Sequence, residues 1–194
     1  TKIQRWSRTN KLVDFCLEVS NLSEVVCLSF VTLTLPNHEW DGTEESLEHD
    51  LKRFKKKITN FLRTKKIKEK IIGGFNFFEQ TYSMENGMNP HCHGIWIMSD
   101  YYDQKELSDD FNGRCDIRKI KSKRKAVNYA SKYSSKGHVF NTRLKESFGI
   151  CRGSARVAIE QELAVMKKEA QDVQDALDWK DNLDYPNPQR GLVD

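Results

Sequence analysis

The chain has few cysteines, and their spacing argues against a disulfide framework. There are five of them, an odd number, and no two form a Cys-x-x-Cys pair. Such cysteines are typical of reduced thiols in a cytosolic protein. They stand at Cys16, Cys27, Cys92, Cys115 and Cys151.

Long apolar runs are also missing from the sequence. No run approaches the roughly 18 residues that a helix needs to cross a bilayer, and no charged-then-apolar leader opens the chain. We therefore expect no membrane partner. The 194 residues are enough for one domain with a real core and an extension.

Charge is abundant but unevenly placed. Lys and Arg number 32 against 28 Asp and Glu, which gives a net charge of +4. Acidic residues gather within 39–50 and after residue 160, whereas basic residues form separate clusters. This asymmetry predicts a polyanionic partner. The basic clusters cover residues 52–57, 65–70 and 118–125.

A His-x-His pair lies in a segment, residues 91–98, that has the pattern of a β-strand. Side chains alternate between the faces of a strand, so His91 and His93 point the same way. A preceding strand, from residue 71 or 74 to 83, is followed by a turn signal at 85–87, and the two strands should form a hairpin.

The hairpin can bring a carboxylate to the two histidines. Glu79 stands in an otherwise aromatic strand, where an unpaired carboxylate would be costly, and the pairing can place it across from them. Two imidazoles and a carboxylate suit Mg²⁺ or Mn²⁺ with a phosphate substrate, and on ligand type alone also Zn²⁺ or Fe²⁺. Gln80, on the opposite face of a regular strand, is the reserve ligand. The alternative is a pair of histidines satisfied by hydrogen bonds within a sheet.

A tyrosine- and lysine-bearing segment has the spacing of one helix face. Tyr129, Lys132, Tyr133 and Lys136 fall at i, i+3, i+4 and i+7, and a buried stripe would not carry two lysines. A tyrosine has a pKa near 10, so a phenolate nucleophile needs help from a metal or a neighbouring cation. The alternative is that both tyrosines only pack on a sheet.

Together these motifs resemble the HUH endonucleases, and specifically the replication initiators (Rep proteins) of rolling-circle plasmids and single-stranded DNA viruses. In that family a His-hydrophobic-His strand comes before a Tyr-x-x-Lys helix, the order seen here, and the resemblance covers roughly residues 25–155. It implies Mg²⁺ or Mn²⁺ as cofactor. It also implies nicking and joining of single-stranded DNA through a 5′-phosphotyrosine, which leaves a free 3′-hydroxyl to prime synthesis.

The resemblance further implies the partners and the place of action. The substrate would be single-stranded DNA at a replication origin, with an origin hairpin as one candidate form, in the cytoplasm of the host cell. The 194 residues are too few for such a domain plus a complete helicase, and whether a helicase domain follows residue 194 stays open. A host helicase and polymerase are candidate partners. Two alternatives remain within DNA metabolism: an HUH-type transposase and a non-catalytic DNA-binding domain. Outside it, a non-haem iron oxygenase would explain the ligands but not the tyrosine helix.

Each expected role falls on numbered residues of this chain. His91, His93 and Glu79 would ligate the metal, and Lys132 and Lys136 would assist phenolate formation or hold the phosphate. The basic run before the tyrosine helix would grip the DNA backbone without reading sequence. Its members are Arg118, Lys119, Lys121, Lys123, Arg124 and Lys125.

The Tyr-x-x-Lys unit is present twice. Tyr129 and Tyr133 are one helical turn apart, about 5.4 Å, so both hydroxyls could reach one phosphate. This doubling resembles the two-tyrosine initiators of single-stranded DNA phages. We expect two usable nucleophiles; the competing interpretation is that one tyrosine cuts and the other positions it or stacks on a base.

The fold predicted is α+β, with a central antiparallel sheet of about five strands. Helices should cover one face and leave the metal on the open face, in the ferredoxin/RRM-like palm that the resemblance implies. The domains expected are a nuclease domain at 1–152, a C-terminal helix at 153–182, and a tail or linker at 183–194. Along that helix an apolar stripe recurs at spacings of four and three, which suits packing on the domain, pairing with a partner helix, or linkage.

Overall fold

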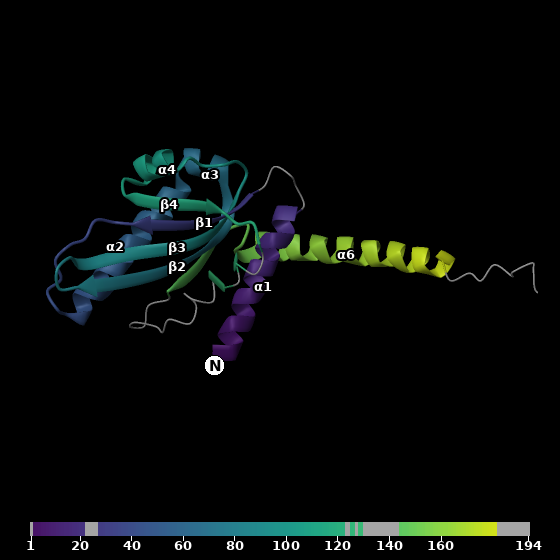
Figure 1. The fold of residues 1–194 in the computed structure, drawn as a ribbon, viewed down its shortest axis with the longest axis horizontal. Helices are drawn as coiled ribbons and strands as arrows, with labels where there is room; N and C mark the ends of the chain where they lie inside the picture. The colour runs from purple at the N-terminus through teal and green to yellow at the C-terminus, as the bar shows by residue number, and fades with distance from the viewer. Residues whose placement is uncertain (1, 22–26, 123–124, 127, 130–143, 182–194) are drawn as a thin grey trace, which may run out of the picture. The chain divides into compact units, whose positions relative to one another are not determined.

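The computed structural model describes residues 2–21, 27–122, 125–126, 128–129 and 144–181. It divides into two compact units, Thr1–Arg156 and Val157–Asp194. The first unit contains one open antiparallel sheet with helices, so the predicted α+β fold class is confirmed (Figure 1). Within the described residues no helix is long and apolar enough to cross a membrane.

The sheet has five strands in the order β4-β1-β3-β2-β5, and every neighbouring pair is antiparallel. The first four strands, with α2 and α4 between them, follow the β-α-β-β-α-β order of a ferredoxin-like domain. β5 extends this arrangement at the edge beside β2. The strands are β1 (Cys27–Thr34), β2 (Ile71–Ser83), β3 (Gly87–Met98), β4 (Arg114–Lys119) and β5 (Lys145–Gly149).

Five helices are described, and two of them begin at side-chain caps. Thr43 caps α2 by accepting a hydrogen bond from the Ser46 amide, and Asp103 caps α4 by accepting from the amides of Lys105 and Glu106. Next to this cap, Asp41 accepts hydrogen bonds from the amide and the hydroxyl of Thr43. The helices are α1 (Lys2–Asn21), α2 (Glu44–Arg63), α3 (Lys65–Lys70), α4 (Gln104–Phe111) and α6 (Gly153–Asp181).

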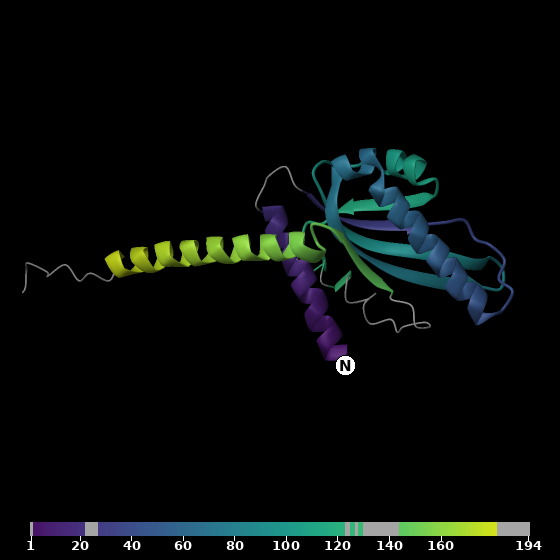
Figure 2. The same ribbon diagram turned by 180° about the vertical axis from the view of Figure 1, so that it is seen from behind.

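One face of the sheet carries the main hydrophobic core. In Figure 1 the strands lie in front of α2, and Figure 2, from behind, shows α2 crossing the sheet. Trp96 and Met98 of β3 are fully buried on this face, as are Leu51, Phe54 and Ile58 on the inner stripe of α2. We call this face of the sheet the helix face. The alternate side chains of the same strands point to the opposite face, which we call the open face.

The second unit consists, within its described residues, of most of α6. Met166 and Val173 of the predicted stripe are exposed, and Leu163 is buried. A helix that exposes apolar residues at heptad spacing is compatible with each of the roles considered for it, and its role stays a prediction.

Candidate active site

The β-ladders align the predicted ligands, which lie on β2 and β3, with residues of β1 and β4. Residues opposite each other in a ladder point to the same face, so each ladder row carries side chains across the open face. The first row is Arg114, Thr34, His91 and Glu79, and the second is Asp116, Thr32, His93 and Phe77. The predicted convergence of Glu79 with the two histidines is therefore present.

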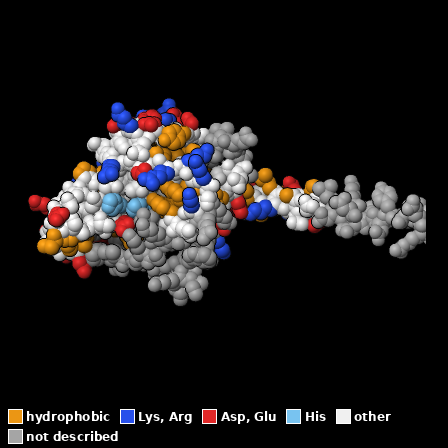
Figure 3. Space-filling model, in the orientation of Figure 1, with side chains coloured by type: hydrophobic (Ala, Val, Ile, Leu, Met, Phe, Trp, Pro, Cys, Tyr) orange, Lys and Arg blue, Asp and Glu red, His pale blue; other side chains and the backbone are white. Residues whose placement is uncertain are grey.

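These rows surround a pocket of about 440 Å³ that opens on this face. Four strands contribute to it, and its walls mix imidazole, carboxylate, hydroxyl and guanidinium groups. Figure 3 shows this side of the molecule, where histidine side chains reach the surface close to an acidic side chain and to lysines and arginines. Its lining includes Thr32, Thr34, Glu79, His91, His93 and Arg114. We call it the open-face pocket.

Two threonines of β1 hold the two imidazole rings. Thr34 Oγ1 lies 3.0 Å from His91 Nδ1, and Thr32 Oγ1 lies 3.2 Å from His93 Nδ1. The rings are consequently close to parallel, at 24°, with centroids 5.9 Å apart. Because both Nδ1 atoms face threonine hydroxyls, both Nε2 atoms are turned toward β2.

The Nε2 atoms meet different groups on β2. His93 Nε2 lies 3.4 Å from a Glu79 carboxylate oxygen, and His91 Nε2 lies 3.3 Å from the Thr81 hydroxyl. Glu79 is opposite His91 in the ladder but reaches diagonally to His93, a contact that a long side chain can make.

Imidazole and carboxylate donors together fit a divalent cation, without choosing among Mg²⁺, Mn²⁺, Zn²⁺ and Fe²⁺. Two donors that bind one Mg²⁺ at about 2.1 Å and at right angles lie roughly 3 Å apart, close to the separation of Glu79 and His93. The side chains as they stand provide this pair rather than a closed cage. Among the described residues, no group of three or more His, Cys, Asp or Glu side chains is gathered closely enough to hold a metal ion. Ligation by Glu79, His91 and His93 therefore stays a prediction.

Tyr129 reaches the histidine side of this pocket. Its hydroxyl lies 3.3 Å from His93 Nδ1 and 3.4 Å from Thr32 Oγ1, and its ring packs on Phe30 at a centroid distance of 4.2 Å. A tyrosine oxygen, an imidazole and a carboxylate thus follow one another from Tyr129 through His93 to Glu79. The other residues predicted on this helix face, Lys132, Tyr133 and Lys136, lie outside the described residues.

The predicted basic run is only partly described. Arg118 is exposed on the open face and forms an ion pair with Asp116 at 3.0 Å. Lys119 follows on β4 and points to the other face, so alternation separates these two cations. Lys121 and Lys125 are exposed, whereas Lys123 and Arg124 lie outside the described residues.

Gln80, the reserve ligand, lies on the helix face, where its amide donates to the Leu47 carbonyl at 3.3 Å. The sequence interpretation missed three other residues of the open-face pocket. Thr32 and Thr34 are two residues apart, as the histidines are, and that shared spacing is the signal that could have found them. Arg114 has the same kind of signal, because it alternates with Asp116 and Arg118 on one strand.

Neither Cys92 nor Cys115 is suited to act as a nucleophile here. Cys92 is buried between the histidines on the helix face, and burial raises its pKa well above the ordinary thiol value. Cys115 borders the open-face pocket, and burial raises its pKa to about 11. At neutral pH both thiols are therefore protonated.

Comparison of the chain with protein-family models, with curated proteins and with solved structures found no match.

Proposed function

We propose that this protein is a metal-dependent endonuclease that nicks and rejoins single-stranded DNA through a covalent 5′-phosphotyrosine, as a rolling-circle replication initiator of the HUH type does. The observation that carries the proposal is the contact of the Tyr129 hydroxyl with His93, whose far nitrogen faces Glu79. A nucleophile beside an imidazole that is oriented by a carboxylate is the general arrangement of covalent catalysis.

The reaction exchanges one phosphodiester bond for another. The Tyr129 oxygen would form a bond to phosphorus while the bond from phosphorus to the 3′ oxygen breaks. The tyrosine gives up its proton and the departing 3′ oxygen takes one, so the nick leaves a 3′-hydroxyl and a phosphotyrosine. Attack of a 3′-hydroxyl on the phosphotyrosine reverses these steps and rejoins the strand.

His93 can assist the phenolate in either state of its ring. With Nε2 protonated toward Glu79, its Nδ1 can accept the Tyr129 proton. With Nε2 engaged as a ligand, the proton stands on Nδ1, which then donates to the Tyr129 or Thr32 oxygen and stabilises the phenolate. Thr32 contacts both partners, so it positions the ring in both cases.

His91, His93 and Glu79 are the residues that would hold Mg²⁺ or Mn²⁺. When bound, the ion would polarise a non-bridging oxygen of the scissile phosphate. Arg114 on the pocket wall and the exposed Arg118 supply fixed positive charge for the neighbouring phosphates. The expected setting is an origin single strand in the host cytoplasm, where a host helicase would unwind the duplex and a host polymerase would extend the released 3′-hydroxyl.

The test is covalent capture. The protein is incubated with Mn²⁺ and a pool of labelled single strands that carry a randomised centre, and adducts are separated on a denaturing gel and sequenced. We expect an adduct on a defined sequence, lost with EDTA and on double-stranded pools. The absence of any adduct across the pool would overturn the proposal.

The same assay tests the number of nucleophiles. Tyr129→Phe, Tyr133→Phe and the double variant are compared on the selected sequence, for cutting and for joining. Two usable nucleophiles predict that each single variant keeps part of the activity and that only the double variant loses all of it. If one single variant matches the loss of the double variant while the other cuts and joins normally, the chain uses one tyrosine. Adduct that persists in the double variant would contradict tyrosine chemistry altogether.

A further inference from the structure

A second pocket lies on the helix face, behind the strands that carry the candidate site. It has a volume of about 720 Å³, within the range of roughly 300–1,000 Å³ that is usual for small-molecule sites. We call it the helix-face pocket. Its apolar floor includes Leu35, Pro36 and Pro90, and its polar side includes Arg53, Lys57 and Asn60 of α2.

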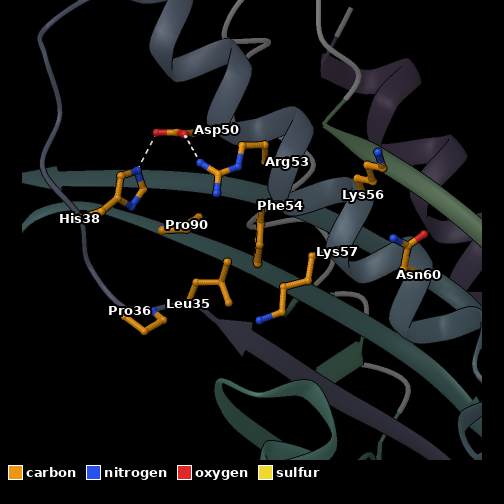
Figure 4. A pocket seen from close by; sticks show the side chains of 10 residues that line it. All are labelled: Leu35, Pro36, His38, Asp50, Arg53, Phe54, Lys56, Lys57, Asn60 and Pro90. Carbon is orange, nitrogen blue, oxygen red and sulfur yellow. Dashed lines mark hydrogen bonds and ion pairs between the residues drawn. The ribbon is translucent and has the colours of Figure 1, made fainter.

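The walls of this pocket differ in chemistry. Three lining residues carry permanent positive charges, namely Arg53, Lys56 and Lys57, and one, Asp50, carries a negative charge. In Figure 4 the Asp50 carboxylate lies between His38 and Arg53, while Lys57 reaches from α2 past Phe54. An apolar floor under a cationic rim suits a ligand with a flat apolar part and an anionic part.

Lys57 is the strongest sign of an anion site. Its ammonium donates to the Asn112 carbonyl at 2.9 Å and lies 4.7 Å from the centre of the Phe111 ring. Both partners are neutral, and burial lowers the pKa of Lys57. A partly buried cation held by neutral groups gains more from an anionic ligand than a solvated surface lysine does.

The rim opposite α2 is fixed in place. His38 exchanges two backbone hydrogen bonds with Met88 of β3, at 3.1 and 2.8 Å. Its Nε2 also lies 2.6 Å from Asp50 Oδ2 on α2. The loop that carries Pro36 is therefore tied to both β3 and α2, and the pocket is formed before any ligand arrives.

The position of this pocket points to the DNA strand as the source of its ligand. Leu35 directly follows Thr34, and Pro90 directly precedes His91, so two short chain segments contribute to both pockets. A single strand that leaves the open-face pocket around the end of β1 would reach the helix-face pocket within a few nucleotides.

We propose that the helix-face pocket binds one nucleotide of the single strand beyond the scissile phosphate, with its base on Leu35, Pro36 and Pro90 and its phosphate at Arg53 and Lys57. The proposal rests on the nicking function above. It assigns to α2 a specific DNA contact rather than a solvated basic surface.

The test measures binding without cleavage. The affinity of the full chain for fluorescent dT12 is measured in EDTA over a series of salt concentrations, for the unchanged protein and for Arg53→Gln/Lys57→Gln. The matched control is Lys52→Gln, an exposed α2 lysine outside the pocket that pairs with Glu48. We expect the double variant to bind at least tenfold more weakly, with a salt slope reduced by about 1.4 for two lost phosphate contacts. The control should stay within twofold.

A second measurement asks whether the base is bound as well. Amide NMR shifts of Leu35 and Asn60 are followed on addition of dTMP, thymidine or inorganic phosphate. Shifts that are largest with dTMP, and that Asn60→Trp abolishes by filling the pocket, support a nucleotide site. Response to phosphate alone would overturn the base contact, and dTMP binding without any dT12 defect would make the ligand a free nucleotide, against the proposal.

The outcomes separate the two proposals. If the unchanged protein forms its tyrosine adduct and the double variant binds dT12 as the control does, the proposed nucleotide site is wrong and the proposed nicking activity is supported. If no adduct forms but dT12 affinity still depends on Arg53 and Lys57, the proposed nicking activity is wrong and the helix-face pocket is still a binding site for single-stranded DNA.

Discussion

The helix face and the open face of the sheet are made from the same strands, often from neighbouring residues. On β3, Cys92 and Trp96 are 1% and 0% exposed among the side chains of α2 and its neighbours, whereas His91 and His93 are only half-buried. One face holds close-packed apolar groups. The other holds titratable groups with hydrogen-bonding partners beside a second set of buried apolar side chains, namely Phe75, Phe77, Ile95 and Ile97. The difference teaches that stability and chemistry are separated here by the alternation of a strand rather than by distance.

The first prediction concerns a substitution in the core on the helix face. Trp96→Ala should lower the free energy of unfolding by about 3–5 kcal/mol, because it opens a cavity in the core. It also removes the indole Nε1 donor that lies 2.8 Å from the side-chain Oδ1 of the buried Asn76. The measurement is urea unfolding followed by circular dichroism.

The control for this prediction is His91→Ala, five residues earlier on the open face. We expect it to change the free energy of unfolding by about 1 kcal/mol or less, since its side chain is partly exposed and lies at the open-face pocket. A loss as large as that of Trp96→Ala would show that the open face contributes equally to stability.

The second prediction concerns the metal. Glu79→Gln and His93→Ala should each abolish measurable Mn²⁺ binding, detected by the electron paramagnetic resonance of the free ion, because they remove the two donors that lie 3.4 Å apart. Gln80→Ala, on the helix face, is the matched control and should bind Mn²⁺ normally. Equal Mn²⁺ binding by all three variants would rule out Glu79 and His93 as ligands of the metal.

The third prediction separates positioning from catalysis on the open face. Thr32→Val keeps the shape of the side chain but removes the hydroxyl 3.2 Å from His93 Nδ1, and adduct formation should fall about 10–100-fold, as for other supporting contacts of metal ligands. Thr32→Ser restores a hydroxyl and should recover most of the activity. If the Thr32→Val and Thr32→Ser variants form adduct equally well, the Thr32 hydroxyl does not position the His93 ring.

The smallest effect is expected from a charge cluster away from both faces. Hydrogen bonds from Lys66 hold the pKa values of Glu106 and Asp110 below their usual range. Depressed carboxyl pKa values stabilise the fold above about pH 4 and lose that contribution as pH falls through the folded-state values. Lys66→Met should therefore lower the melting temperature slightly at pH 7 and less at pH 3. The same decrease at both pH values would mean that packing, not charge, is responsible.

Local sequence signals predicted much of the fold and half of the site. The turn before Gly87 and the face of Glu79 follow from local chemistry and from strand alternation, and the structure confirms both. Gly87 has φ 70° and its missing Cβ would lie 2.3 Å from the His38 carbonyl oxygen, so only glycine fits this turn.

What the sequence by itself determined is which side chains share a face, because the two-residue period of a strand needs no knowledge of its partners. Only the tertiary structure decided which strands meet. The register of β1 against β3 places Thr32 and Thr34 behind the histidines, and β4 adds Arg114. The diagonal contact of Glu79 with His93 depends on side-chain conformation within that packing. These contacts join residues far apart in the sequence. The free energy that stabilises them comes from the whole assembled sheet, so no single segment of the sequence reveals them.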